Sequence, residues 1–191
     1  MRKILTVLAA LASLSLTNCG YNAIQQNDES VKSAWSEVVN QYQRRADLIP
    51  NLVNTVKGYA EFEQETLTQV IEARAKATSV NINAENLNEQ TLAQFQQAQD
   101  GLSSALSRLM VVVEKYPELK ANQNFLELQA QLEGTENRIA NERMKFNETT
   151  KSYNVYTRKF PATIFAGMFG FEQKPYFEAA EGAEKAPEVK F

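Results

Sequence analysis

Apolar residues recur at steps of three and four from Val31 onward, which is the spacing of one face of an α-helix. The positions are Val31, Trp35, Val38, Tyr42, Ile49, Leu52, Val56 and Ala60. The pattern continues in phase through Leu67 and Val70 to about Thr78. Such a stripe predicts a long helix, or two helices in series, with one face buried in a core. Arg45 occupies a position of the stripe where an apolar residue is expected.

The same spacing returns twice in the rest of the chain. A second stripe runs from Leu92 to Tyr116 and ends before Pro117, and a third runs from Phe125 to Phe160 before Pro161. Asn88 is a candidate N-cap for the second helix, and Asn122 or Asn124 for the third. No strand-like alternation of any length competes with these stripes. The sequence therefore predicts an all-α, antiparallel up-and-down bundle of three to four long helices.

Pro50 decides how many helices the bundle has. A proline inside a helix leaves the carbonyl four residues earlier, here that of Ala46, without its usual donor. One helix over residues 27–78 would be roughly 75 Å long and would overhang the others. A break near Pro50 would give four helices of more similar length. The segment DLIP has no glycine and the stripe keeps its phase, which favours one long helix kinked at Pro50.

The amino terminus has the pattern of a processing signal. Arg2 and Lys3 precede an apolar run, and the sole cysteine, Cys19, follows that run. The arrangement resembles a bacterial lipobox, although Asn18 is larger than the residue usually found before the cysteine. We expect residues 1–18 to be a signal peptide and 19–26 a lipidated tether, with Cys19 carrying acyl chains such as palmitate. The alternatives are an ordinary cleaved signal or an uncleaved anchor.

The composition narrows the possible chemistry. The chain of 191 residues has no histidine, one cysteine and a net charge of −3. It has no basic stripe, which argues against nucleic acid as a partner. The usual zinc ligands and catalytic motifs are missing, so we predict no metal, no cofactor and no enzyme activity. Glu61 and Glu65, which share a helix face, offer a weak alternative as a carboxylate-based enzyme.

Several stretches resemble the LemA family of bacterial membrane-associated helical proteins. They are AWSEVVNQYQRRADLIPNLVNTVKGYAEFEQETLTQVIEARAKA, NFLELQAQLEGTENRIANERMKFNETTKSYN, RKFPATIFAGMFGF and the closing APEVKF. The resemblance implies a helical bundle displayed from a membrane by an N-terminal anchor, and it implies no reaction. Phe62 departs from the family, which often has histidine there. The lipobox in place of a plain membrane helix is a second departure. The residues that carry the family signature are Arg44, Arg45, Asp47, Pro50, Asn51, Lys57, Gly58, Tyr59, Thr135, Glu136, Asn137 and Arg138.

Two interpretations of the charged signature residues stay open. In the structural interpretation, Arg45 and Asp47 pair with polar residues of a neighbouring helix, for which Glu136 and Arg138 are the candidates. A buried charge must be matched, and such a pair would fix the register of the helices. In the functional interpretation, Arg44 and Arg45 grip a carboxylate or phosphate of a ligand.

The uncharged segment Phe160–Phe171, FPATIFAGMFGF, also has two interpretations. Ile164, Phe165, Met168 and Phe169 plug one end of the bundle, or together with Phe160 they form an interfacial or partner-binding patch. In a four-helix bundle, Phe160 would lie at the same end of the bundle as Cys19. In a three-helix bundle, it would lie at the opposite end. The predicted bundle covers residues 27–171, and residues 172–191 are expected to form an acidic tail.

These observations predict a lipoprotein tethered on the exported side of the bacterial cell envelope. We expect it to act as a scaffold or adaptor for an envelope protein whose identity the sequence does not give. The alternative is a self-associating protein that shapes or supports the envelope.

Overall fold

The computed structural model describes the backbone of residues 2–58 and 64–178, and the side chains of these ranges from Gly20 onward. Within these ranges all regular structure is helical, which confirms the all-α prediction. The elements in order are α1 (Arg2–Lys57), α2 (Gln64–Ser79), the 3₁₀ turn η1 (Ala84–Asn86), α3 (Glu89–Val113), α4 (Pro117–Lys120), α5 (Gln123–Arg158) and α6 (Ala162–Phe169).

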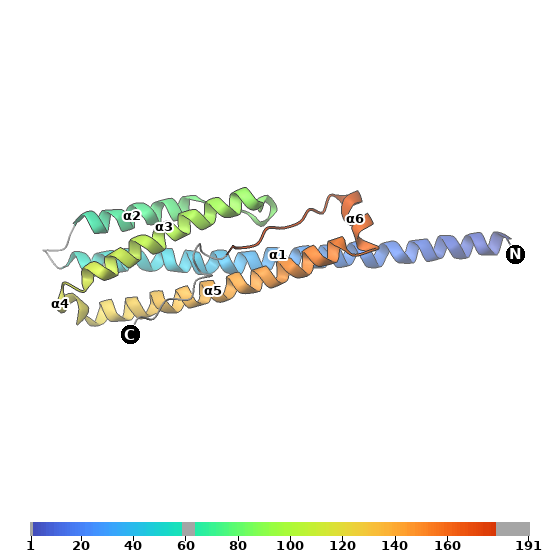
Figure 1. Cartoon of the computed structure of the whole chain (residues 1–191). Helices are drawn as coiled ribbons and strands as arrows, with labels where there is room; N and C mark the ends of the chain where they lie inside the picture. The colour runs from blue at the N-terminus through green and yellow to red at the C-terminus, as the bar shows by residue number, and fades with distance from the viewer. Residues whose placement is uncertain (1, 59–63, 179–191) are drawn as a thin grey trace, which may run out of the picture.

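Four helices make an up-and-down bundle. The long helices α1 and α5 run antiparallel and pack along one another, and α2 and α3 form a second antiparallel pair beside them (Figure 1). The short helix α4 lies at the end far from the amino terminus, and α6 lies near the other end of the bundle (Figure 1). The four-helix alternative left open by the sequence is therefore the one adopted.

The helix break lies after Pro50 rather than at it. α1 continues through Pro50 and ends at Lys57, while α2 begins at Gln64. A first helix reaching to Thr78 was therefore a wrong prediction. Gly58 follows the last helical residue, as glycine commonly does at a helix end. The stripe hid the break because Val56 and Leu67 are eleven residues apart, about three turns, and so present the same face.

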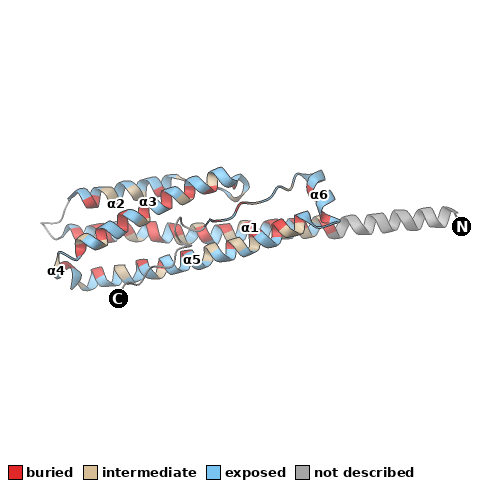
Figure 2. Cartoon of the chain, viewed as in Figure 1, coloured by how far each residue is buried: buried red, intermediate tan, exposed pale blue. Residues whose placement is uncertain are grey.

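The core consists of two apolar clusters arranged along the bundle, seen as buried positions on every long helix (Figure 2). The first is centred on Trp35, whose ring lies 5.3 Å from that of Phe95 and 5.6 Å from that of Phe146. Its indole N–H donates to the carbonyl of Ile82 at 2.9 Å. The second is built from α1, α2, α3 and α5 around Leu52, Leu102, Leu109 and Phe125, all buried.

The predicted helix caps are present. The side chain of Asn88 accepts from the N–H of Thr91 and forms a capping box with it. Of the two candidates for α5, Asn122 is the cap and accepts from the N–H of Phe125 at 3.1 Å. At the amino-terminal end, residues 20–26 belong to α1 and Ile24 is fully buried, so this part of the expected tether is packed into the bundle.

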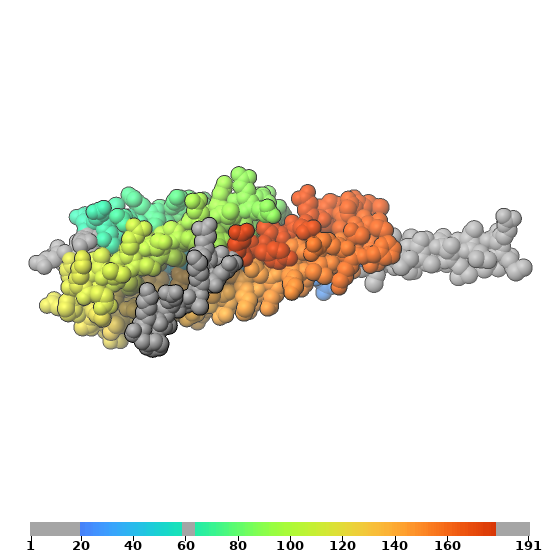
Figure 3. Space-filling model, viewed as in Figure 1, coloured from blue at the N-terminus to red at the C-terminus, as the bar shows by residue number. Residues whose placement is uncertain are grey.

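The chain after α6 folds back along the bundle as an extended strap, which we define as residues 171–178 (Figure 3). Asn154 both donates to the carbonyl of Lys174 and accepts from its N–H, at 2.8 and 2.9 Å. Asn147 does the same for Phe177, at 3.0 and 2.9 Å. Phe177 is buried in the first cluster, 5.9 Å from the ring of Trp35. The start of the predicted acidic tail is thus part of the fold, and residues 179–191 lie outside the described residues.

Candidate functional sites: a polar layer and an exposed apolar end

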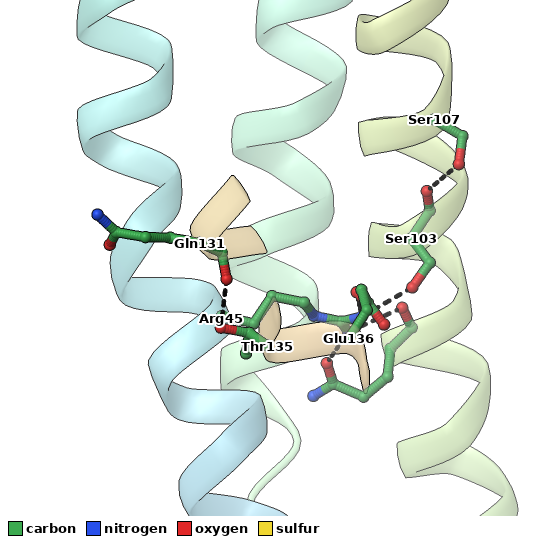
Figure 4. Close-up of polar contacts among 7 residues, drawn as sticks. Arg45, Ser103, Ser107, Gln131, Thr135 and Glu136 are labelled. Atoms are coloured by element: carbon green, nitrogen blue, oxygen red, sulfur yellow. Dashed lines mark hydrogen bonds and ion pairs between the residues drawn. The ribbon is translucent and has the colours of Figure 1, made fainter. Parts of the chain in front are cut away.

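Arg45 is buried in the middle of the bundle, with 1% of its surface exposed. Its Nη1 donates to Glu136 Oε1 at 2.5 Å and to Ser103 Oγ at 2.8 Å (Figure 4). Its Nη2 donates to the side-chain and main-chain oxygens of Gln99, at 2.7 and 3.3 Å. The guanidinium also lies over the ring of Tyr42, 5.0 Å from its centroid. Both terminal nitrogens are therefore occupied by acceptors of the protein itself.

These contacts form a polar layer, which we define as Arg45, Gln99, Ser103, Thr135 and Glu136. The amide of Gln99 also donates to the carbonyl of Ala77 on α2, at 3.3 Å, so the layer joins all four helices. Thr135 is buried beside it and donates to Gln131 of its own helix (Figure 4). Arg45 on α1, Gln99 on α3, and Thr135 and Glu136 on α5 lie between the residues of the first and second apolar clusters. It therefore divides the core into two compartments.

The predicted pairing of Arg45 with Glu136 is confirmed, but Asp47 and Arg138 take no part in it. Asp47 is exposed and accepts from Gln43 on its own helix at 2.8 Å, and Arg138 is exposed. A residue two positions from Arg45 is turned by about 200° around the helix, so Asp47 faces away from the layer. Arg138 is likewise two positions from Glu136, so it also faces away from the layer.

The remaining signature residues do not converge on Arg45. Arg44 is exposed, so the two arginines do not form a joint fork for a ligand. The other exposed signature residues are Pro50, Asn51, Lys57, Gly58 and Asn137. Tyr59 lies outside the described residues, as do Glu61 and Phe62. Glu65 is exposed and accepts from Gln69 of its own helix.

Arg74 supplies the hydrogen bond that Pro50 takes away. The carbonyl of Ala46 would receive the N–H of residue 50 in a regular helix, and proline has none. Nε of Arg74, on α2, donates to this carbonyl at 2.7 Å. Sequence reasoning identified the unpaired carbonyl but missed its donor. The available signal was an arginine in line with the apolar stripe of the first pattern, and the structure shows it partly buried.

A surface hollow of about 840 Å³ lies between the start of α3 and the strap. Its polar lining includes Asn88, Gln96, Lys174 and Glu178. The side chains of the described residues hold no group of three or more histidines, cysteines, aspartates or glutamates placed to bind a metal ion.

α6 exposes its large apolar side chains and buries its small ones. Ala162 and Ala166, one turn apart, face the bundle and are 4% and 6% exposed. Ile164, Met168 and Phe169 are 52%, 70% and 55% exposed, so of the two interpretations the plug is wrong for these three side chains. Small residues let the short helix lie close to the bundle, which turns the larger side chains outward. Phe165 is the exception, since it packs partly against the core.

The exposed face of α6 lies at the end of the bundle formed by Gly20 and Tyr21 of α1. A Cβ atom added to Gly20 would meet the ring of Phe165 at 2.8 Å, so glycine permits this close approach. The ring of Tyr21 lies 4.8 Å from that of Phe169. The side chains of residues 1–19, including that of Cys19, are not among those that the structure describes. Among the described residues, no helix has both the length and the hydropathy that a membrane span needs.

Comparison with known proteins assigns the chain to a family. A family model described as the LemA family matches residues 34–191. Magnetosome protein MamQ of Magnetospirillum gryphiswaldense is 26% identical over 190 residues, covering 91% of this chain and 70% of the relative. Protein LemA of Metamycoplasma hominis is 21% identical over 160 residues, covering 84% and 69%. Because the family model covers most of the chain, this protein belongs to the LemA family.

Proposed function

We propose that this protein is a membrane-tethered lipoprotein of the bacterial cell envelope that works through protein contacts, as a scaffold or adaptor. The observation that carries the proposal is the course of α1. α1 is already packed into the bundle at Gly20, so a chain cleaved before Cys19 would pass from its lipidated residue into the bundle without an intervening loop. A lipid anchor at this end would hold the bundle directly at the membrane surface.

Cys19 is the proposed lipidation site. It is the sole cysteine, and it directly follows the signal-like segment of the chain. Cleavage before Cys19 would make Gly20 the second residue of the mature protein, so the acyl chains would be attached next to the packed part of α1. A buried acyl chain contributes roughly 0.8 kcal/mol per CH₂, so several chains would give a stable anchor.

The outer faces of the helices support a role in binding other proteins. Met144 on α5 and Val111 on α3 are 56% and 69% exposed. A shallow surface hollow of about 600 Å³ lies beside Met144, lined also by Lys151, Arg158 and Tyr176. Methionine, tyrosine and arginine are among the residue types enriched at protein–protein interfaces.

The lipid anchor is tested with Cys19→Ser in the full chain. We expect the variant to leave the membrane fraction, or to keep its signal uncut and migrate as a larger protein. A matched Ser79→Ala variant, which changes an exposed hydroxyl of α2, should behave as wild type. Normal processing together with unchanged membrane retention in Cys19→Ser would refute lipidation at this residue.

The adaptor role is tested by photo-crosslinking in living cells. A photoreactive amino acid replaces Met144 in one strain and Val111 in another, and the adducts are identified by mass spectrometry. We expect a reproducible adduct to another envelope protein from one of these faces. Adducts between copies of the chain alone would establish the self-associating alternative, and the absence of adducts from both faces would contradict either role.

A further inference from the structure

We propose that α6 is a second membrane contact, an interfacial helix that inserts into the headgroup–acyl boundary of the bilayer beside the amino-terminal anchor. The contact surface, which we name the α6 patch, consists of Phe160, Ile164, Met168 and Phe169. This inference rests on the proposed function, because it requires the amino terminus to be held at a membrane. It assigns to the bundle a fixed end that faces the lipid.

The α6 patch is large, apolar and uncovered. Its four side chains are 52% to 82% exposed, and Phe160 is the most exposed of them. The segment Phe160–Phe171 contains no charged residue. Several large apolar side chains left exposed on one short segment point to an interaction site more strongly than a single exposed one does. Twelve residues cannot cross a bilayer as a helix, so the matching arrangement is a helix lying in the interface.

The backbone of α6 is prepared for a water-poor environment. At its start, Pro161 has no N–H, and the N–H groups of Thr163 and Ile164 donate to the carbonyls of Lys159 and Pro161. At its end, Gly170 takes a positive φ of 71°, and the N–H of Phe171 donates to the carbonyl of Ala166 at 2.9 Å. Backbone groups left unpaired in lipid are costly, and these bonds reduce their number.

The position of the α6 patch selects a bilayer as its occupant. Phe165 packs on Gly20, and Phe169 lies beside Tyr21, so the patch is within about one helical turn of Cys19 along α1. An acylated Cys19 would sit at the membrane surface. The α6 patch would therefore be held at the same height, and its apolar side chains would meet lipid before any other partner.

The charges at the edge of the α6 patch suit anionic headgroups. Arg158 and Lys159 are exposed directly before Phe160. Glu172 is the exposed acidic residue on the other side, while Lys174 is paired with Asp28 at 3.2 Å. An apolar face accompanied by arginine and lysine is typical of helices that lie in the membrane interface.

The experiment measures how close two matched positions come to lipid. Met168→Cys in the α6 patch and Met144→Cys on the outer face of α5 each introduce a thiol at an exposed methionine. The full chains are labelled with a fluorophore and reconstituted in vesicles of phosphatidylethanolamine and phosphatidylglycerol. Some of the lipids carry a quencher near the top of the acyl chain. We expect the probe at residue 168 to lose more than half of its fluorescence and the probe at residue 144 to lose little.

A second variant tests the chemistry of the patch. A probe at Ile164→Cys should be quenched like that at residue 168, and adding Met168→Asp should reduce the quenching, because a charge opposes insertion. Vesicle flotation separates the two levels of the proposal. Protein that floats while residue 168 is quenched no more than residue 144 overturns the role of α6 and leaves the tether standing. Protein that does not float overturns both.

Oligomeric size in the same vesicles identifies another occupant. If residue 168 is unquenched and crosslinks to its counterpart in a second chain, the α6 patch is a dimer interface and the membrane contact is refuted. A second labelled thiol in mass spectra of the Met168→Cys chain would show that Cys19 is not acylated. That result would refute the lipid anchor of the proposed function, and quenching at residue 168 would still report on α6 itself.

Discussion

The guanidinium of Arg45 takes acceptors from α3 and α5 at one level of the bundle. A shift of either helix by one turn, about 5.4 Å, would remove these acceptors and leave a buried charge unpaired. Leucine at this position would pack with either cluster and would tolerate such a shift more easily. We infer that the polar layer fixes register, at some cost in stability compared with an apolar core.

Replacing Arg45 with alanine should lower the free energy of unfolding by about 2–3 kcal/mol, because Gln99 and Glu136 lose their charged partner. Glu136 is half-exposed and can be rehydrated, which keeps the loss below that of a fully buried pair. Arg44→Ala is the matched control, since this exposed neighbour should change stability by at most about 0.5 kcal/mol. Urea unfolding followed by circular dichroism measures both. Equal midpoints for the two variants would contradict the structural role of Arg45.

The bond from Arg74 to the carbonyl of Ala46 connects α2 to α1 at the place where Pro50 interrupts the helix ladder. Arg74→Ala should cost about 1–2 kcal/mol, since it leaves a buried carbonyl unpaired. In a Pro50→Ala background the N–H of residue 50 can return to that carbonyl, so the same change should cost clearly less. Arg108→Ala, an exposed arginine on α3, should have the same effect in both backgrounds. An equal cost of Arg74→Ala in the two backgrounds would show that the bond does not compensate for Pro50.

At the scale of elements, the strap is held much as a β-strand is held by its neighbour. Asn147 and Asn154 are seven residues apart on α5, and each offers its amide as both donor and acceptor to one residue of the strap. Tyr153, between them, donates to the carbonyl of Glu172 at 3.0 Å. Burial raises the pKa of Tyr153 to about 12, so its hydroxyl stays protonated and able to donate at neutral pH.

Asn147→Ala should release the carboxyl-terminal half of the strap without melting the helices. The N–H of Phe177 loses its acceptor, so we expect its hydrogen exchange to become about tenfold faster or more. Asn147→Asp keeps an acceptor and loses the donor, so its exchange rate should lie between those of the wild type and Asn147→Ala. Asn137→Ala, at an exposed position of the same helix, should leave exchange in residues 172–178 unchanged. Mass spectrometry of a peptide that covers the strap measures this exchange. Wild-type protection in the Asn147→Ala variant would contradict the role of Asn147.

Sequence periodicity predicted the helices well because burial repeats with the helical turn. Trp35, Leu102 and Ile139 all lie in predicted stripes and all are buried. Phe160 ended the third stripe by spacing alone and is exposed, because α5 stops at Arg158 and the chain turns away. The strap gave no periodic signal. Its bonds join side chains to backbone atoms, and backbone atoms are the same for every sequence.

The polar layer was only half predictable for a related reason. A charged residue at an apolar position demands a partner, and this logic led from Arg45 to Glu136. It could not identify Gln99 and Ser103, because polar residues of these types occur at many exposed positions and only the packing of α3 brings these two to Arg45. The inverted face of α6 was missed because Ala162 and Ala166 are less apolar than the residues around them.

At the scale of the whole molecule, the four-helix course places α6 beside Gly20 and Tyr21 of α1 and α4 at the opposite end of the bundle (Figure 1). From Gly20 to Lys57, α1 rises roughly 55 Å at 1.5 Å per residue. The full sequence has 20 basic and 23 acidic residues. Removal of Arg2 and Lys3 with the signal peptide would leave 18 basic residues and a net charge of −5. A chain with this net negative charge would be repelled by anionic lipid, whereas the uncharged segment Phe160–Phe171, preceded by Arg158 and Lys159, would not.

An upright bundle follows from this distribution, and it can be distinguished from one lying flat. A donor dye at Lys120→Cys, in exposed α4, should show little energy transfer to acceptor dyes on the lipid headgroups when a short-range dye pair is used. The same donor at Met168→Cys should show strong transfer, since α6 lies at the membrane end. Strong transfer from both positions would mean that the bundle lies along the surface. In that case lipid would cover the faces of α3 and α5 that carry Val111 and Met144. The adaptor role would then require a partner able to displace the membrane from these faces.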